Sequence, residues 1–188
     1  DGRVLIASSV PHPECAGRDL ADIAAEWGLS QEAAAARLQP GSAIYFLMDE
    51  ADVQAIMAFD PTMIGSDGIP LGDKPHPRLW GTFPRVLGHY SRDLGLFPLE
   101  TAVWKMTGLT ARNFGLQGRG TLKEGSHADV VIFDAATVRD AATYETPTQP
   151  AEGIAAVIVN GVVAWQNGAH SGARSGQVVT RTTSKETA

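Results

Sequence analysis

Pro61-Thr-Met-Ile-Gly-Ser-Asp-Gly68 is the most informative segment of this sequence. Its short apolar run, residues 62–64, has the length of a buried strand, and it leads to a carboxylate between two glycines. Catalytic groups of α/β enzymes stand at the carboxyl ends of such strands, which makes Asp67 a candidate catalytic residue. A turn over residues 65–68 is the alternative interpretation, because Gly, Ser and Asp all favour turns.

The residues before this stretch predict alternating strands and helices. Residues 43–48 form a continuous apolar run of strand length, and residues 49–59 carry apolar side chains at helical spacing. Together with residues 62–64 they predict a βαβ unit, which favours a parallel sheet with helices on its faces. Nearer the N-terminus we expect a strand at 3–8 and helices at 19–27, with Asp19 as N-cap, and 30–38.

The pattern changes after this unit. Residues 69–96 are rich in Gly, Pro, His and Arg and predict a long functional loop. Helices are expected at 98–106 and 110–114, followed by strands at 120–122 and 128–134 and by a hairpin at 155–165 with an Asn-Gly turn. We therefore expect barrel-type α/β structure with an inserted helical segment over 1–118, a small β domain over 119–181 and a tail over 182–188.

Composition limits the classes of partner. The formal net charge is −6, from 15 basic and 21 acidic residues, which argues against nucleic acid or an anionic membrane surface. No apolar run reaches the roughly 20 residues of a membrane span, and Cys15 stands alone. We expect a soluble, cytoplasmic protein whose partner is a small molecule.

Several motifs together resemble one enzyme family. They are Gly65-Ser-Asp-Gly68, His76-Pro-Arg-Leu-Trp-Gly-Thr-Phe-Pro-Arg-Val-Leu87, Ala102-Val-Trp-Lys-Met-Thr107, Ala128-Asp-Val-Val-Ile-Phe-Asp134 and Val159-Asn-Gly161. Over residues 17–181 the chain resembles the C-terminal part of the N-acyl-D-amino-acid deacylases, the D-aminoacylase family of metal-dependent amidohydrolases. The string that begins at His76 is the discriminating one, whereas the Ala-Asp and Asn-Gly motifs are shared across the superfamily.

The resemblance implies a fold and a chemistry. The fold is the C-terminal part of a (β/α)₈ TIM barrel plus a small β-sandwich, with a zinc site at the barrel mouth. Asp67 matches the aspartate that takes a proton from the zinc-activated water and passes it to the leaving amine, and it is the one zinc ligand suggested within this chain. Arg78 matches the arginine that binds the α-carboxylate of an N-acyl-D-amino acid, a task that suits the guanidinium fork. A loop arginine paired to Asp73 or Glu100 is the alternative for Arg78.

The metal site needs more than this chain offers. The resemblance places the histidine and cysteine ligands upstream of Asp1, so an N-terminal part, either a separate chain or a part that was lost, is expected to complete the zinc site. Cys15 follows Pro13-Glu14 in a loop and does not replace the cysteine ligand. His76 and the other scattered histidines, His12, His89, His127 and His170, favour structural roles.

Aromatic and acidic side chains offer further candidates. An acyl pocket could be lined by Trp80, Phe83, Trp104 and Phe114, but the helical positions of Trp104 and Phe114 favour core packing. The carboxylates of Glu50, Asp52 and Asp60 fit a solvated helix start better than acid-base catalysis. The alternative functions are a non-catalytic binding or assembly module derived from an amidohydrolase, and a cyclic amidase of hydantoinase or dihydroorotase type.

Overall fold

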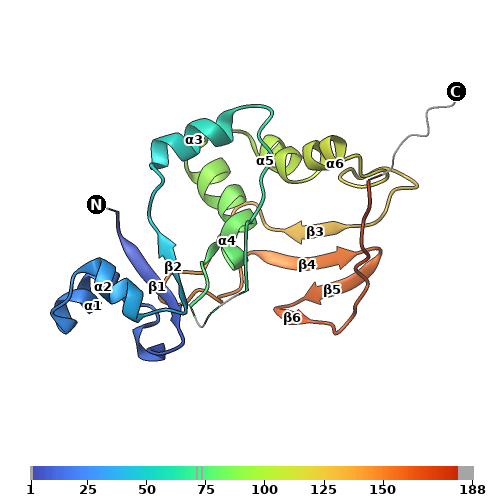
Figure 1. Cartoon of the computed structure of the whole chain (residues 1–188). Helices are drawn as coiled ribbons and strands as arrows, with labels where there is room; N and C mark the ends of the chain where they lie inside the picture. Colours follow the sequence, from blue (N-terminus) through green and yellow to red (C-terminus); the bar gives the residue numbers. More distant parts are fainter. Residues whose placement is uncertain (1, 71, 73, 182–188) are drawn as a thin grey trace, which may run out of the picture. The chain divides into compact units, whose positions relative to one another are not determined.

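The computed structural model describes residues 2–70, 72 and 74–181 (Figure 1). Their contacts group the chain into two compact units, the first made of Asp1–Val53, Ser66–Thr82 and Ala141–Pro150 and the second of the remainder. The predicted domains, 1–118 and 119–181, remain a prediction, and the predicted tail lies outside the described residues. No described helix is long and apolar enough to cross a membrane.

The first unit contains a two-stranded sheet. Strand β1 (Val4–Ser9) confirms the predicted first strand, and it pairs antiparallel with β2 (Gly41–Tyr45), so that Ile6 lies opposite Ala43. The expected parallel sheet is wrong here, since no parallel strands pair in the part of the chain that the structure describes. Strand β2 also ends at Tyr45, and Leu47 and Met48 beyond it are exposed rather than buried in a strand.

Both faces of β1 are covered, as expected from the alternation of side chains along a strand. Ile6 packs against α1 (Leu20–Trp27) and α2 (Gln31–Arg37), in a cluster that includes Ile23 and Leu38. Leu5 and Ala7 point to the other face, where they pack with Ile44, Phe46 and Tyr144. The first unit therefore has two small cores, one on each side of the sheet.

Both helices begin and end largely as the sequence predicts. Gly28 closes α1 in the left-handed conformation, and the Ser30 hydroxyl accepts a hydrogen bond from the Ala33 N–H at the start of α2. Asp19 stands at the N-cap of α1, but its carboxylate pairs with Arg3 at 2.7 Å instead of capping the helix.

The predicted strand at 62–64 is wrong. After α3 (Glu50–Ala58) these residues have no regular secondary structure, and the Ile64 N–H donates to the Lys105 carbonyl at 3.2 Å. The apolar run fits a strand by length, but no neighbouring strand within the described chain pairs with it. The backbone of this run is hydrogen-bonded to Lys105 in α5 (Leu99–Met106) instead.

The predicted long loop at 69–96 is only partly a loop. Helix α4 (Arg78–Arg85) and the π-helical η2 (Val86–Asp93) occupy its second half. Pro84 lies near the end of α4 and lacks the N–H that would continue the helical ladder, which explains why the sequence reads as weakly helical there. Helices α5 and α6 (Gly108–Phe114) then follow as predicted, with Gly115 closing α6.

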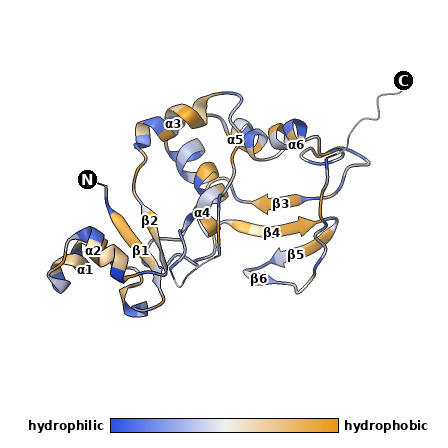
Figure 2. Ribbon diagram, in the orientation of Figure 1, coloured by the Kyte–Doolittle hydropathy of each residue, from blue (hydrophilic) through white to orange (hydrophobic). Residues whose placement is uncertain are grey.

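The second unit contains a four-stranded antiparallel sheet in the order β3 (Val130–Phe133), β4 (Ile154–Val159), β5 (Val162–Gln166) and β6 (Ala169–His170). Figure 2 shows that β3 and β4 are the most hydrophobic of the four. Asn160 and Gly161, both at positive φ, form the predicted hairpin turn. The strand predicted at 120–122 is wrong, because residues 120 and 121 form a bend and residue 122 has no regular structure.

Candidate active site

Asp67 lies in an irregular segment and has a left-handed backbone conformation. Its φ is 48°, in the left-handed region that aspartate tolerates better than most residues. Gly65 has open space around it, and neither Gly65 nor Gly68 has a positive φ. Residues 65–68 have no regular secondary structure, so they form neither the end of a strand nor a backbone hydrogen-bonded turn.

Gly68 is required for a different reason. A Cβ atom at this position would lie 2.6 Å from Leu79 Cδ1 and 2.8 Å from Leu79 Cα, closer than packed atoms approach. Glycine thus lets the backbone that carries Asp67 lie directly against the first turn of α4. This contact is local to the first unit and brings Asp67 near the residues that begin the helix.

Asp67 and Arg78 form an ion pair. The Arg78 Nη2 atom lies 2.9 Å from Asp67 Oδ2, and the side chains are 41% and 78% exposed, respectively. The sequence offered Asp73 and Glu100 as structural partners of Arg78; Asp73 lies outside the described residues, and the recorded ion pair of Arg78 is with Asp67. The structure therefore brings together the two residues that the sequence singled out for proton transfer and carboxylate binding.

His76 connects to the backbone of Arg78. The Arg78 N–H donates to His76 Nδ1 at 3.0 Å, and His76 Nε2 lies 3.4 Å from the Tyr144 hydroxyl. Partial burial and the positive charge of Arg78 lower the pKa of His76 below its ordinary value. Tyr144 was missed in the sequence analysis because it lies 68 residues after His76, in a polar segment without periodicity.

A cavity of about 340 Å³ adjoins these residues. Its lining combines four side chains that carry polar groups, Ser42, Tyr45, His76 and Arg78, with the apolar residues Ala7, Ala43, Ile44, Ile69 and Pro75. A hollow in which apolar side chains surround a few polar groups is typical of a small-molecule site. None of Trp80, Phe83, Trp104 and Phe114 lines it.

The side chains of Trp104 and Phe114, which were expected in the core, are exposed instead. Trp104 is 39% exposed and Phe114 56% exposed, so the core-packing prediction is wrong for both. Trp104 lies under the Arg112 guanidinium at 5.3 Å and covers Gly108, where a Cβ atom would meet its ring at 2.2 Å. It joins α5 to α6 at the surface of the second unit.

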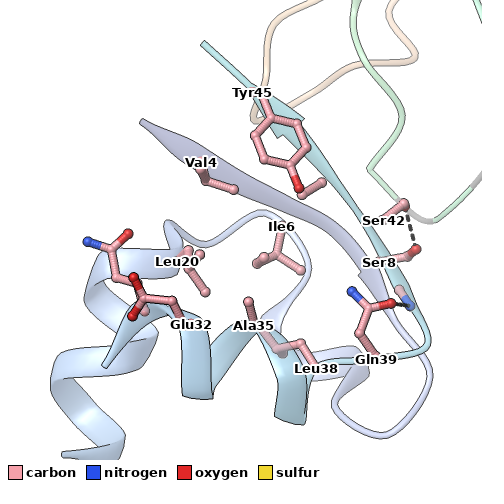
Figure 3. A pocket seen from close by; sticks show the side chains of 13 residues that line it. Val4, Ile6, Ser8, Leu20, Glu32, Ala35, Leu38, Gln39, Ser42 and Tyr45 are labelled. Carbon is pink, nitrogen blue, oxygen red and sulfur yellow. Dashed lines mark hydrogen bonds between the residues drawn. The ribbon is translucent and has the colours of Figure 1, made fainter. Parts of the chain in front are cut away.

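A second cavity, of about 290 Å³, lies between the sheet and α2. Figure 3 shows Val4, Ile6 and Tyr45 on one side of it and Glu32, Ala35 and Leu38 on the other. It contains none of the predicted site residues, and we assign the site to the cavity beside Arg78 instead.

Metal-ligating side chains do not gather within the described ranges. No three His, Cys, Asp or Glu side chains among them come close enough to hold a metal ion. Cys15 is 1% exposed in the cluster beneath β1, where burial raises its thiol pKa, and its exclusion as a ligand stays a prediction. Glu50 and Asp52 stand exposed in the first turn of α3, as expected.

The fold and the site define an α/β protein in which an acidic and a basic side chain meet beside a hollow lined by both apolar and polar side chains. The sequence model of the amidohydrolase family matches residues 16–164. This chain belongs to the amidohydrolase family.

Within this family, the chain is most informatively compared with the deacylases of N-acyl-D-amino acids. The chain is 62% identical to D-aminoacylase of Alcaligenes xylosoxydans xylosoxydans over 96% of its length, which is 37% of that enzyme. A crystal structure of D-aminoacylase matches with a TM-score of 0.93 at 62% identity, covering 96% of this chain and 38% of that one. N-acyl-D-glutamate deacylase of Bordetella bronchiseptica, solved with zinc and a phosphonate inhibitor, matches with a TM-score of 0.85 at 52% identity, over 88% and 35% of the two chains.

These matches confirm the predicted resemblance and the α/β amidohydrolase fold class. The chain spans little more than a third of the length of these relatives. It therefore has the fold of a part of such an enzyme.

Proposed function

We propose that this chain is the C-terminal part of a zinc-dependent N-acyl-D-amino-acid deacylase, which hydrolyses the amide to a carboxylate and a D-amino acid. The Asp67–Arg78 pair beside the cavity carries the proposal. It unites a proton-transfer group and a carboxylate-binding group in a chain 62% identical to D-aminoacylase.

Each residue has a distinct role in the proposed reaction. Asp67 accepts a proton from the attacking water and then delivers it to the nitrogen of the leaving amine. Arg78 exchanges its bond to Asp67 for two parallel bonds to the substrate α-carboxylate, so that substrate binding frees the Asp67 carboxylate. Zinc, when bound, supplies Lewis-acid activation of the water and the amide carbonyl.

The zinc site is proposed to be shared. Catalytic zinc uses three protein ligands, the described residues bring no three candidate ligands together, and Asp67 is the ligand that the resemblance suggests within this chain. We assign the others to the N-terminal part of the barrel, carried on the same polypeptide or on a separate one. In this arrangement residues 1–118 contribute to the barrel and residues 119–181 form the small β domain. A cytoplasmic location fits the lone, reduced Cys15.

The test is turnover in the assembly that contains the N-terminal part. Asp67→Asn should lower kcat for an N-acyl-D-amino acid by 100-fold or more, by the usual size of acid-base effects of about 10²–10⁴. Asp22→Asn, which changes an exposed aspartate on α1, is the matched control and should leave kcat unchanged. Full activity of Asp67→Asn would exclude the proton-transfer role.

The alternatives predict different results. A cyclic amidase would hydrolyse hydantoin or dihydroorotate and ignore N-acyl-D-amino acids. A binding or assembly module would show no turnover and no zinc by metal analysis, even in the complete assembly.

A further inference from the structure

We propose that His76 is a positioning residue for Arg78 and that Tyr144 holds it in the tautomer this task requires. The inference rests on the proposed carboxylate-binding role of Arg78. The groups that carry it are the Arg78 N–H, both ring nitrogens of His76 and the Tyr144 hydroxyl.

The tautomer follows from the first hydrogen bond. A backbone N–H can only donate, so His76 Nδ1, which lies 3.0 Å from the Arg78 nitrogen, must carry a free electron pair. The neutral ring then has its proton on Nε2, and this N–H donates to the Tyr144 hydroxyl oxygen at 3.4 Å. Tyr144 thereby favours the form of His76 that accepts from Arg78.

The accepted N–H belongs to the start of a helix. Arg78 is the first residue of α4, and its N–H is one of those that a helix cannot satisfy internally. His76 Nδ1 supplies the missing acceptor two residues earlier, as asparagine does in an Asx turn. The bond therefore fixes the backbone from which the Arg78 side chain reaches Asp67.

Tyr144 is itself firmly held. Its ring packs on Phe46 with centroids 4.9 Å apart and meets the His76 ring edge-on at 5.3 Å. The residues next to this contact form a second one, in which Lys74 Nζ donates a hydrogen bond to the Glu145 carbonyl at 2.7 Å. The segment before α4 therefore contacts the 141–150 segment of the same unit twice, through His76 and through Lys74.

Two substitutions at His76 distinguish the role of Nδ1 from that of Nε2. His76→Asn retains an acceptor close to Nδ1 and loses the group at Nε2, whereas His76→Gln places its polar group near Nε2 and loses the acceptor for Arg78. Tyr144→Phe removes the hydroxyl and retains the ring that packs on Phe46.

The first measurement uses the 188-residue chain itself and needs no activity. Nitrogen-15 NMR should show His76 protonated on Nε2 at pH 8, and hydrogen exchange should show a protected Arg78 amide in the wild type and His76→Asn but not in His76→Gln. Tyr144→Phe should increase the Nδ1-protonated fraction. A wild-type ring protonated on Nδ1, or equal protection in all variants, would overturn the proposal.

The second measurement uses the active assembly and compares an N-acyl-D-amino acid with its neutral N-acyl-D-amino amide. His76→Gln should raise KM for the acid roughly tenfold with little change in kcat and leave the amide unaffected, while His76→Asn should resemble the wild type. Equal losses on both compounds would show a merely structural role and refute the proposal. A wild-type assembly without turnover refutes the proposed function instead, and the NMR and exchange results then decide the role of His76.

Discussion

The Nζ atom of Lys105 donates a hydrogen bond of 2.7 Å to the backbone carbonyl of Phe59, 46 residues earlier in the chain. The same ammonium group donates to the carbonyls of Asp60 and Thr62, at 3.2 and 3.3 Å. Lys105 is 1% exposed, so its charge is compensated by these carbonyl dipoles rather than by water. One buried lysine therefore holds the end of α3 and the segment that leads to Asp67.

We expect Lys105→Met to destabilise the chain by about 2 kcal/mol. The substitution fills similar space but leaves three carbonyl oxygens without their charged donor, and hydrogen bonds to charged groups contribute about 1.5–3 kcal/mol. Urea unfolding should show the loss, with Lys123→Met, at an exposed position, as the control. A change equal to that of the control would mean that water replaces the ammonium group.

Gly68→Ala and Gly65→Ala should differ strongly although they lie three residues apart. The Cβ atom added at Gly68 meets Leu79, including its backbone Cα at 2.8 Å, so we expect a loss of about 1–3 kcal/mol. Gly65 has open space and ordinary φ, and its substitution should stay within about 0.5 kcal/mol. Thermal unfolding of both variants tests this, and equal effects would contradict the described approach of Gly68 to α4.

Local signals in the sequence predicted the local structure well. The helices predicted at 19–27 and 30–38 match α1 and α2, and the Asn-Gly pair predicted the hairpin turn, because these signals depend on residues within a few positions of one another. The apolar run at 62–64 was read as a strand because strand length is also a local signal. Strand pairing depends on distant residues. Here the Ile64 N–H donates to the Lys105 carbonyl instead of to a neighbouring strand.

The candidate site was predicted in part for the same reason. Asp67 and Arg78 came from motifs of one short region, and the structure pairs them. Tyr144 was not predicted, because it contacts His76 Nε2 across 68 residues of sequence and no spacing rule covers such a contact.

Asp129 should make stability depend on pH in acid. The Asn160 N–H, which donates to its Oδ1 at 2.8 Å, and the Arg119 guanidinium lower the pKa of Asp129 below its ordinary value. The unfolded chain binds this proton at higher pH than the folded chain does. The stabilisation is therefore complete above about pH 4 and is lost as pH falls through the lowered pKa.

Asp129→Asn should remove this dependence. At pH 7 we expect it to lower the free energy of unfolding by about 1–2 kcal/mol, because the acceptor for the Asn160 N–H and Arg119 weakens. Below pH 4 its stability should converge with that of the wild type. Chemical unfolding from pH 7 to 3 measures the difference, and Glu124→Gln, an exposed carboxylate in the same segment, is the control. Parallel curves for Asp129→Asn and wild type would exclude this contribution.

The Asp67–Arg78 ion pair should contribute little to the free energy of unfolding. Effects of its substitution on turnover can then be attributed to function rather than to folding. Both side chains are more than one-third exposed, and ion pairs of this kind contribute about 0–1 kcal/mol. Asn also tolerates the left-handed backbone at position 67, so Asp67→Asn adds no strain there. We expect Asp67→Asn and Arg78→Lys to unfold in urea within about 1 kcal/mol of the wild type. A loss above 2 kcal/mol for either would show that the pair supports the fold, and a loss of turnover in that variant would then be no measure of proton transfer or carboxylate binding.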